Sequence, residues 1–249
     1  MKMKKIIILF LLIPFINFAQ TKKTKKKAKA SITKTITKTI TTTKTSDLLD
    51  ISGGLKEALN KGITEQVAKL TAVDGFYKNN VVKILMPEEL SLLENRLRKL
   101  GLGNLTDDAI KSLNRAAEDA VKTATPIFVN AIKNINISDA KGILMGSENA
   151  ATSFLQNGTS QELYAKFSPV VQESIGKVGA DAAWNAIITK YNKIPLVTKV
   201  NPDVTDYVTS KALEGVFKMI ALEEKNIRTN LKSRTSGLLQ QVFAIQDKK

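Results

Sequence analysis

The sequence predicts an all-α fold, a single domain of about ten short to medium helices. Three observations predict it. From Asp47 onward, apolar residues recur at helical spacing in one stretch after another, and residues typical of helix starts separate these stretches. No stretch shows the sustained period-two alternation of a β-strand. The roughly 200 residues involved suffice for one domain with its own core.

Two helices with leucine-rich stripes are expected first. The stripe of the first, within residues 54–70, consists of Leu55, Leu59, Ile63, Val67 and Leu70. The second begins at Pro87, which suits a first helical position, and Gly101 stops it. Its leucines are spaced by three, four and three residues, at Leu90, Leu93, Leu97 and Leu100.

Cap residues predict where the middle helices begin. Thr106, Ser138 and Ser147 are each expected to cap a helix, and Pro126 to open another. Thr159 and Glu162 form the pattern of a capping box. The helix after them carries a buried stripe, and Pro169 is expected to kink or divide it. That stripe consists of Leu163, Phe167, Val171 and Ile175.

Three helices are expected to complete the domain. One, in residues 181–193, contains the single Trp184, and a loop with two prolines follows it. The longest helix begins near Asp203, and a last short helix lies in residues 236–245. The apolar face of the longest helix consists of Val208, Ala212, Phe217 and Ile220.

The N-terminus predicts export. Residues 1–19 combine a Lys-rich start with a short apolar run that ends near Ala19, as in a cleaved signal peptide. The run is shorter than the about 20 residues of a membrane-spanning helix. Because the chain contains no Cys, it cannot carry the thioether-linked lipid of a bacterial lipoprotein. We therefore expect a periplasmic or otherwise exported protein without disulfides.

The positive charge is concentrated in the first 45 residues. They contain twelve Lys and neither Asp nor Glu, so that residues 46–249 keep only +3 of the formal net charge of +15. Residues 20–46 are low in complexity and rich in Lys and Thr, which predicts a disordered arm before a helical domain at 47–249. The arm is either a solvated linker or a tether. As a tether, the lysines from Lys22 to Lys44 would meet phospholipid headgroups, lipopolysaccharide or acidic wall polymer. No nucleic-acid partner is expected, because the arm lacks aromatic residues for base stacking.

The composition limits the chemistry that the chain can perform. It contains neither His nor Cys, which removes the commonest general base, the thiolate nucleophile and the usual zinc and haem ligands. No phosphate-binding loop, nucleophile elbow or calcium loop is present. We therefore expect no metal and no cofactor. Carboxylates such as Glu223 and Glu224 remain candidates for hydrolysis, but neighbouring positions of a helix do not face one pocket.

An ordered set of segments resembles one bacterial envelope family. The set includes "DGFYKNNVVKILMPEEL" from Asp74, "SLNRAAEDAV" from Ser112, "DYVTSKALEGVFKMIALEEKNIR" from Asp206 and "RTSGLLQQVF" from Arg234. In order and together they are similar to the family of domain of unknown function 4197, over most of residues 52–243. The resemblance implies a signal peptide and a helical body. It assigns no activity.

Polar side chains within these segments are the candidate site. They are Asn114, Arg115, Glu118, Asp206, Tyr207, Lys211, Glu214, Glu223, Glu224 and Arg228. Asn114 lies on the apolar face of its helix, where an amide without partners costs several kcal/mol. Either Asn114 bonds to a neighbouring helix end, with Arg115 and Glu118 in a charge network beside it, or these groups line a cavity for an amphiphile or a peptide.

Three functions follow from these patterns. The preferred one is a non-catalytic periplasmic binding or interaction module that takes an apolar or amphiphilic ligand between its helices. The second is a structural envelope protein that its basic arm holds on an anionic surface. The third is a carboxylate-dependent hydrolase.

Overall fold

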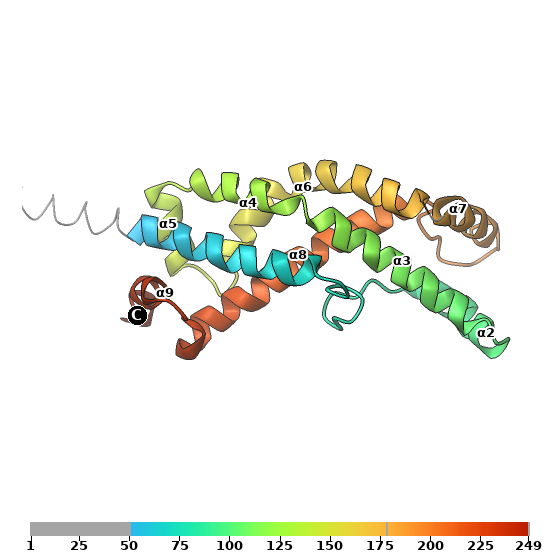
Figure 1. Ribbon diagram of the computed structural model, residues 1–249, viewed down its shortest axis with the longest axis horizontal. Coiled ribbons are helices and arrows are strands. Elements are labelled where there is room, and N and C mark those ends of the chain that lie inside the picture. The colour runs from blue at the N-terminus through green and yellow to red at the C-terminus, as the bar shows by residue number, and fades with distance from the viewer. Residues whose placement is uncertain (1–50, 178, 249) are drawn as a thin grey trace, which may run out of the picture. The chain divides into compact units, whose positions relative to one another are not determined.

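The all-α prediction is confirmed by the computed structural model, which describes residues 51–177 and 179–248 (Figure 1). These residues form nine α-helices and three short 3-10 helices, with no strand among them. The predicted signal peptide at 1–19, the predicted arm at 20–46 and the predicted domain start at 47 lie outside the described residues. Within the described part of the chain, no helix is both long and apolar enough to cross a bilayer.

The first helix covers residues 51–71 of the described chain, and residues 72–87 form turns and irregular structure. The next elements are η1 (Glu88–Leu90), α2 (Ser91–Lys99), α3 (Gly103–Val121), α4 (Ala124–Lys133) and α5 (Ile137–Met145). They are followed by α6 (Ala150–Gly176), α7 (Ala180–Tyr191) and α8 (Val204–Thr229). The chain continues through η2 (Leu231–Ser233), α9 (Gly237–Phe243) and η3 (Gln246–Lys248).

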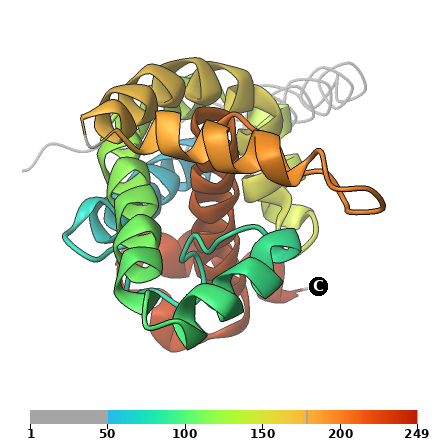
Figure 2. The same ribbon diagram turned by 90° about the vertical axis from the view of Figure 1, so that its right-hand side faces the viewer.

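The core is built where α3, α6 and α8 pack against one another. Viewed from the end that carries α2 and α7, the other helices surround α8 (Figure 2). Phe128 and Phe217 meet edge to face inside, with ring centroids 6.0 Å apart. The stripe predicted for α6 is confirmed, since Leu163, Phe167 and Val171 are fully buried.

Several predicted helix starts are wrong. α3 begins three residues before Thr106 and α6 begins at Ala150, so neither Thr106 nor Ser147 is a cap. The cap of α5 is Asn136 instead of Ser138, because the Asn136 amide accepts the N–H of Asp139 while the Asp139 carboxylate accepts the N–H of Asn136. This reciprocal pair satisfies two N–H groups at once.

The predicted division of α6 is also wrong, because the helix continues through Thr159 and Pro169 for 27 residues. The Thr159 hydroxyl donates to the carbonyl of Leu155 at 2.7 Å, which is a bond available inside a helix. The apolar residues buried on both sides of Pro169 hold the helix together across the missing N–H. α6 is therefore longer than α8, which has 26 residues.

The second predicted helix forms, but its stripe is only partly buried, with Leu93 and Leu97 half-buried and Leu100 exposed. α2 contains no buried residue, and Leu90, which is buried, belongs to η1. Gly101 ends the helix as predicted, with a φ of 80° that suits glycine. The apolar face of α2 therefore has no complete cover among the described residues.

Candidate functional site

The predicted site residues lie in three places along α3 and α8. Asn114, Arg115 and Glu118 hold residues 72–87, which we call the anchored segment. Asp206, Tyr207, Lys211 and Glu214 lie on the first half of α8, and Glu223, Glu224 and Arg228 on its second half. The three groups do not converge on one pocket.

Asn114 binds the main chain of the anchored segment. Its Oδ1 accepts the N–H of Ile84 at 2.8 Å, and its Nδ2 donates to the carbonyl of Ile84 at 2.7 Å and to that of Ile110 at 2.7 Å. The side chain is fully buried. Both main-chain groups of Ile84 reach one amide only if they point to the same side, as in an extended chain. Asn114 thus fixes a loop residue instead of a helix end.

Glu118 and Arg115 fix the start of the same segment. Glu118 Oε1 accepts the N–H groups of Phe76 and Tyr77 at 3.0 and 3.3 Å, and its Oε2 pairs with Arg115 at 2.5 Å. Arg115 also pairs with Asp74, which has a left-handed backbone with a φ of 69°. Hydrogen bonds from Lys78 and Arg115 lower the pKa of the Asp74 carboxyl. The carboxylate of Glu118 therefore replaces backbone partners that this irregular segment lacks.

Two tyrosines hold the end of the segment. The hydroxyl of Tyr207 donates to the carbonyl of Leu85 at 2.8 Å, and that of Tyr191 donates to the carbonyl of Glu89 in η1 at 2.9 Å. The Tyr207 ring stacks on Trp184 at a centroid distance of 5.8 Å. Side chains from α7 and α8 thus hold the end of the segment and η1, which follows it.

Tyr207 is expected to make stability depend on alkaline pH. Burial, with the nearby charges of Glu214 and Glu89, raises the pKa of Tyr207 to about 12. In the unfolded chain it loses its proton near pH 10. Its contribution to the free energy of unfolding is therefore complete below about pH 10 and is lost as pH rises towards about 12.

Urea unfolding across this pH range should show a shallower fall in the free energy of unfolding for Tyr207→Phe than for the parent chain. Equal slopes would contradict the assignment. The pKa of Tyr164 is also raised to about 12, by its hydrogen bond to Asp206. Tyr164 is unchanged in the variant and accounts for part of the fall in stability that remains.

An open groove lies between residues 81–89 and α8. It has a volume of about 480 Å³, and the face of α8 that lines it carries Tyr207, Lys211, Glu214 and Lys218. Lys211 and Glu214 pair with each other at 2.8 Å and are well exposed. Gly215 forms part of the wall, where a Cβ would lie 2.7 Å from the ring of Phe76. The absence of a side chain at Gly215 allows the anchored segment to lie against α8.

Asp206 has a local role at the start of α8. Its carboxylate accepts the hydroxyl of Tyr164 and the side-chain amide of Asn201. Its own N–H bonds to Asp203, the side chain of which caps α8. Asp206 therefore ties α6 and the loop before α8 to this helix end, outside the groove.

Glu224 closes the start of α6. Its two carboxylate oxygens accept the N–H groups of Ala151 at 2.9 Å and Thr152 at 2.8 Å, and the hydroxyl of Thr152 at 2.8 Å. The first N–H groups of a helix have no partner in the helix, and its N-terminus favours negative charge. Glu224 thus caps α6 from α8, 73 residues away along the chain.

Arg228 closes the end of α5 in the same way. Its guanidinium donates to the carbonyls of Ile143 at 2.7 Å and Leu144 at 3.0 Å, and it pairs with Glu224 at 2.7 Å. Both charged side chains are buried. A carboxylate on one helix start and a cation on one helix end match the charge preference of each. The pair therefore joins α5, α6 and α8.

Arg234 was not predicted as a site residue. It is only 3% exposed, donates to the carbonyls of Ile227 and Arg228 at the end of α8, and pairs with Asp247. Arg228 and Arg234 both lie over the Phe243 ring, 5.5 and 5.6 Å from its centroid. Arg234 is the first residue of the family-like segment "RTSGLLQQVF". That resemblance was the sequence signal that could have identified it.

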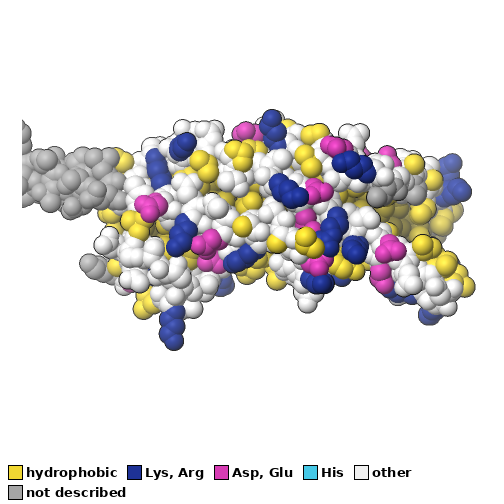
Figure 3. All heavy atoms as spheres, in the orientation of Figure 1, with side chains coloured by type: hydrophobic (Ala, Val, Ile, Leu, Met, Phe, Trp, Pro, Cys, Tyr) yellow, Lys and Arg dark blue, Asp and Glu magenta, His cyan; other side chains and the backbone are white. Residues whose placement is uncertain are grey.

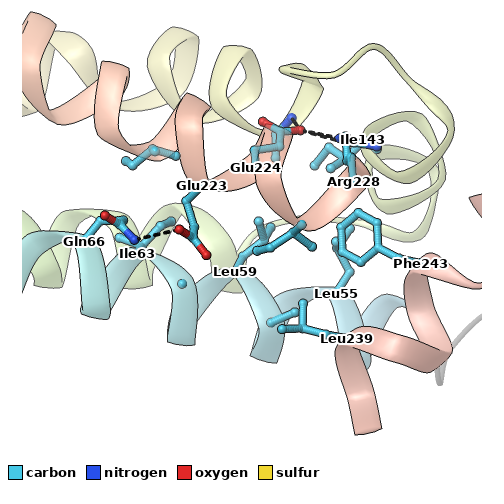
Figure 4. A pocket seen from close by; sticks show the side chains of 15 residues that line it. Leu55, Leu59, Ile63, Gln66, Ile143, Glu223, Glu224, Arg228, Leu239 and Phe243 are labelled. Atoms are coloured by element: carbon cyan, nitrogen blue, oxygen red, sulfur yellow. Dashed lines mark hydrogen bonds and ion pairs between the residues drawn. The ribbon is translucent and has the colours of Figure 1, made fainter. Parts of the chain in front are cut away.

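Glu223 points away from Glu224, towards the first helix (Figure 4). It accepts a hydrogen bond from Gln66 at 3.1 Å. Gln66 is 2% exposed and was also missed, although it lies three residues after Ile63 on the apolar stripe. The pocket beside them has a volume of only about 40 Å³, room for a few water molecules.

The described residues offer no group of three or more Asp, Glu, His or Cys side chains placed to hold a metal ion. In a comparison with known proteins, residues 44–244 match the family model described as "Protein of unknown function (DUF4197)". Neither curated proteins nor solved structures match the chain. Because the match covers far more than half of the sequence, the chain belongs to the DUF4197 family.

Proposed function

We propose that the protein is an exported, non-catalytic interaction module that binds an extended stretch of a partner polypeptide in the groove between the anchored segment and α8. The observation that carries this proposal is the contrast between two volumes. The groove has about 480 Å³, within the range of ligand sites, whereas the apolar pocket between the first helix and α8 has about 40 Å³. The groove has room for a ligand, whereas this pocket is too small for an amphiphile.

The groove offers main-chain groups to such a partner. In an extended chain, the N–H and C=O groups of alternate residues point to opposite sides. Ile84 faces Asn114, and the carbonyl of Leu85 faces Tyr207 on α8. Among the described residues, the Leu85 N–H and the Lys83 carbonyl have no hydrogen-bond partner. A partner chain laid along this edge would satisfy both groups, as in strand addition.

The side chains of the groove favour a polar peptide over a lipid tail. Lys211, Glu214 and Lys218 on α8 present charges of both signs. Leu85 is 55% exposed beside them and offers one apolar contact. Such a mixture matches a backbone with alternating polar and apolar side chains, because main-chain bonds give affinity and side chains give selectivity.

Export is part of the proposal and is supported by the sequence pattern of residues 1–19. An anionic envelope surface remains a second partner for the lysines from Lys22 to Lys44, as the charge of residues 20–46 suggests. A carboxylate-dependent hydrolase is less well supported. It needs two acids that converge across a cleft, whereas Glu223 bonds to Gln66 and Glu224 to the start of α6.

Site-specific photocrosslinking in the producing cell tests the groove. A benzoylphenylalanine at Leu85 should give a discrete adduct, which mass spectrometry identifies as one polypeptide. The same residue at Gln172, exposed on α6, serves as the matched control. Equal adducts from both positions, or none from Leu85 while the folded protein accumulates, would overturn the proposal.

A further inference from the structure

Exposed apolar side chains gather in two turns at one end of the molecule. One turn joins α2 to α3, and the other joins α7 to α8. Figures 1 and 2 both place these turns at the end that carries α2 and α7. The space-filling view shows hydrophobic side chains at this end, with Lys and Arg beside them (Figure 3). The first helix begins at the other end (Figure 1), where a Cβ on Gly54 would meet Val242 and Leu238 of α9.

The turn between α2 and α3 carries leucines that lie at the surface instead of in the core. Leu100 is 74% exposed, Leu105 65% and Leu102 41%. Leu92 on α2 adds a further exposed side chain, at 73%. A single exposed leucine is ordinary, but several on one projecting turn indicate a surface that something else covers.

The turn between α7 and α8 contains a leucine with a strained backbone conformation. Leu196 follows Pro195, has a φ of 65° and is fully exposed. A bulky residue rarely adopts this left-handed backbone, which glycine takes without cost. The strain is not offset by packing, because the side chain contacts solvent. Ile194, 53% exposed, lies beside it. A strained and exposed leucine is expected where the side chain serves an external contact.

Both turns carry more cations than acids. Residues 95–106 contain Arg96, Arg98 and Lys99 and no Asp or Glu. Residues 188–200 contain three lysines, Lys190, Lys193 and Lys199, and no Asp or Glu. Arg98 pairs with Glu94 and Asp107, whereas the other five cations have no ion-pair partner among the described residues. The two turns thus hold +6, although residues 46–249 as a whole hold only +3.

We propose that these two turns dock the helical body on an anionic lipid bilayer, with their leucines in the headgroup region and their cations against lipid phosphates. Apolar side chains flanked by Lys and Arg suit such an interface, where burial of the leucines and attraction of the cations act together. A protein partner suits the turns less well. A stable protein interface needs about 800 Å² of matched surface on each side, and these leucines lie on two separate projections. This contact is independent of the groove and of the basic arm.

Labelling of the full chain tests where it touches a bilayer. Because the chain has no Cys, a single introduced Cys gives one site for an environment-sensitive fluorophore. We expect labels at Leu105→Cys and Leu196→Cys to shift to the blue with vesicles of phosphatidylcholine and phosphatidylglycerol, and to be quenched by nitroxide-labelled lipid. A label at Ser138→Cys on α5, exposed at the other end, should show neither change.

Each other outcome overturns the proposal. Vesicle binding with no shift at positions 105 and 196 would place the contact elsewhere, for instance on the arm. A shift that grows with protein concentration in the absence of vesicles would identify a second copy as the occupant. No binding to anionic vesicles would exclude the bilayer.

Matched charge variants give an independent measurement. Lys193→Gln with Lys199→Gln should weaken vesicle binding about tenfold or more, since each Lys near an anionic surface contributes to affinity. Lys61→Gln with Lys69→Gln removes the same charge from exposed positions of the first helix and should change binding little. Leu196→Gly should weaken binding while the folded protein becomes no less stable, because glycine relieves the strain. Equal losses from both Lys pairs would contradict docking through these turns.

Discussion

Replacing Glu224 with Ala should lower the free energy of unfolding by about 3–5 kcal/mol, the usual cost of breaking a buried ion pair from one side. The change leaves Arg228 charged and buried, and it removes the acceptor of the first N–H groups of α6. Urea unfolding followed by circular dichroism measures the effect. A native domain has only about 5–15 kcal/mol to lose, so the variant should be close to unfolding.

Glu223→Ala is the matched control, on the neighbouring position of the same helix. Among the described residues its side chain accepts a single hydrogen bond, from Gln66, and the expected loss is about 1 kcal/mol. A double variant, Glu224→Leu with Arg228→Leu, should cost less than the sum of the two single changes, because no buried charge is left alone. Additive losses, or equal losses for Glu223 and Glu224, would refute the role of the pair.

Asn114→Leu should cost about 3 kcal/mol or more. It removes three hydrogen bonds and leaves the buried N–H and C=O of Ile84 without partners, each of which carries a penalty of about 1–3 kcal/mol. Hydrogen exchange should accelerate in residues 79–87 more than in the core of α3, since the anchored segment loses its central contact.

Asn104→Leu provides the comparison, because this amide lies exposed on the first turn of the same helix. Its replacement should change stability by less than about 0.5 kcal/mol. If Asn114→Leu were as harmless as Asn104→Leu, the amide would not hold the segment. If exchange rose uniformly instead, Asn114 would act on the whole bundle.

The spacing of apolar residues predicted the helices because it follows directly from which side of each helix is buried. Residues such as Leu163, Phe167 and Val208 recur with the helical period because one side of each helix faces the core. Cap positions were harder to predict. A Ser or Thr inside a helix can bond to a preceding carbonyl, as Thr159 does, so its presence does not by itself mark a start.

The polar site was predicted only in part, for a physical reason. Asn114 stood out because a polar group on an apolar face needs partners, and Glu118, Glu224 and Arg228 were named as polar residues of the family-like segments. Their partners are largely main-chain groups of segments 30 to 85 residues away. Every residue has an N–H or a C=O, so the sequence carries no mark of which one is used.

The way in which the anchored segment is held links ligand binding to thermal stability. Its attachments come from α3 and α8, and Tyr191 of α7 holds η1 directly after it, so the groove exists only while these helices are assembled. A ligand that bridges the segment and α8 binds the native chain alone. At a hundredfold excess over its dissociation constant it would add about 2.7 kcal/mol by mass action. A melting-temperature screen of peptides would therefore find occupants of the groove without any assay of activity.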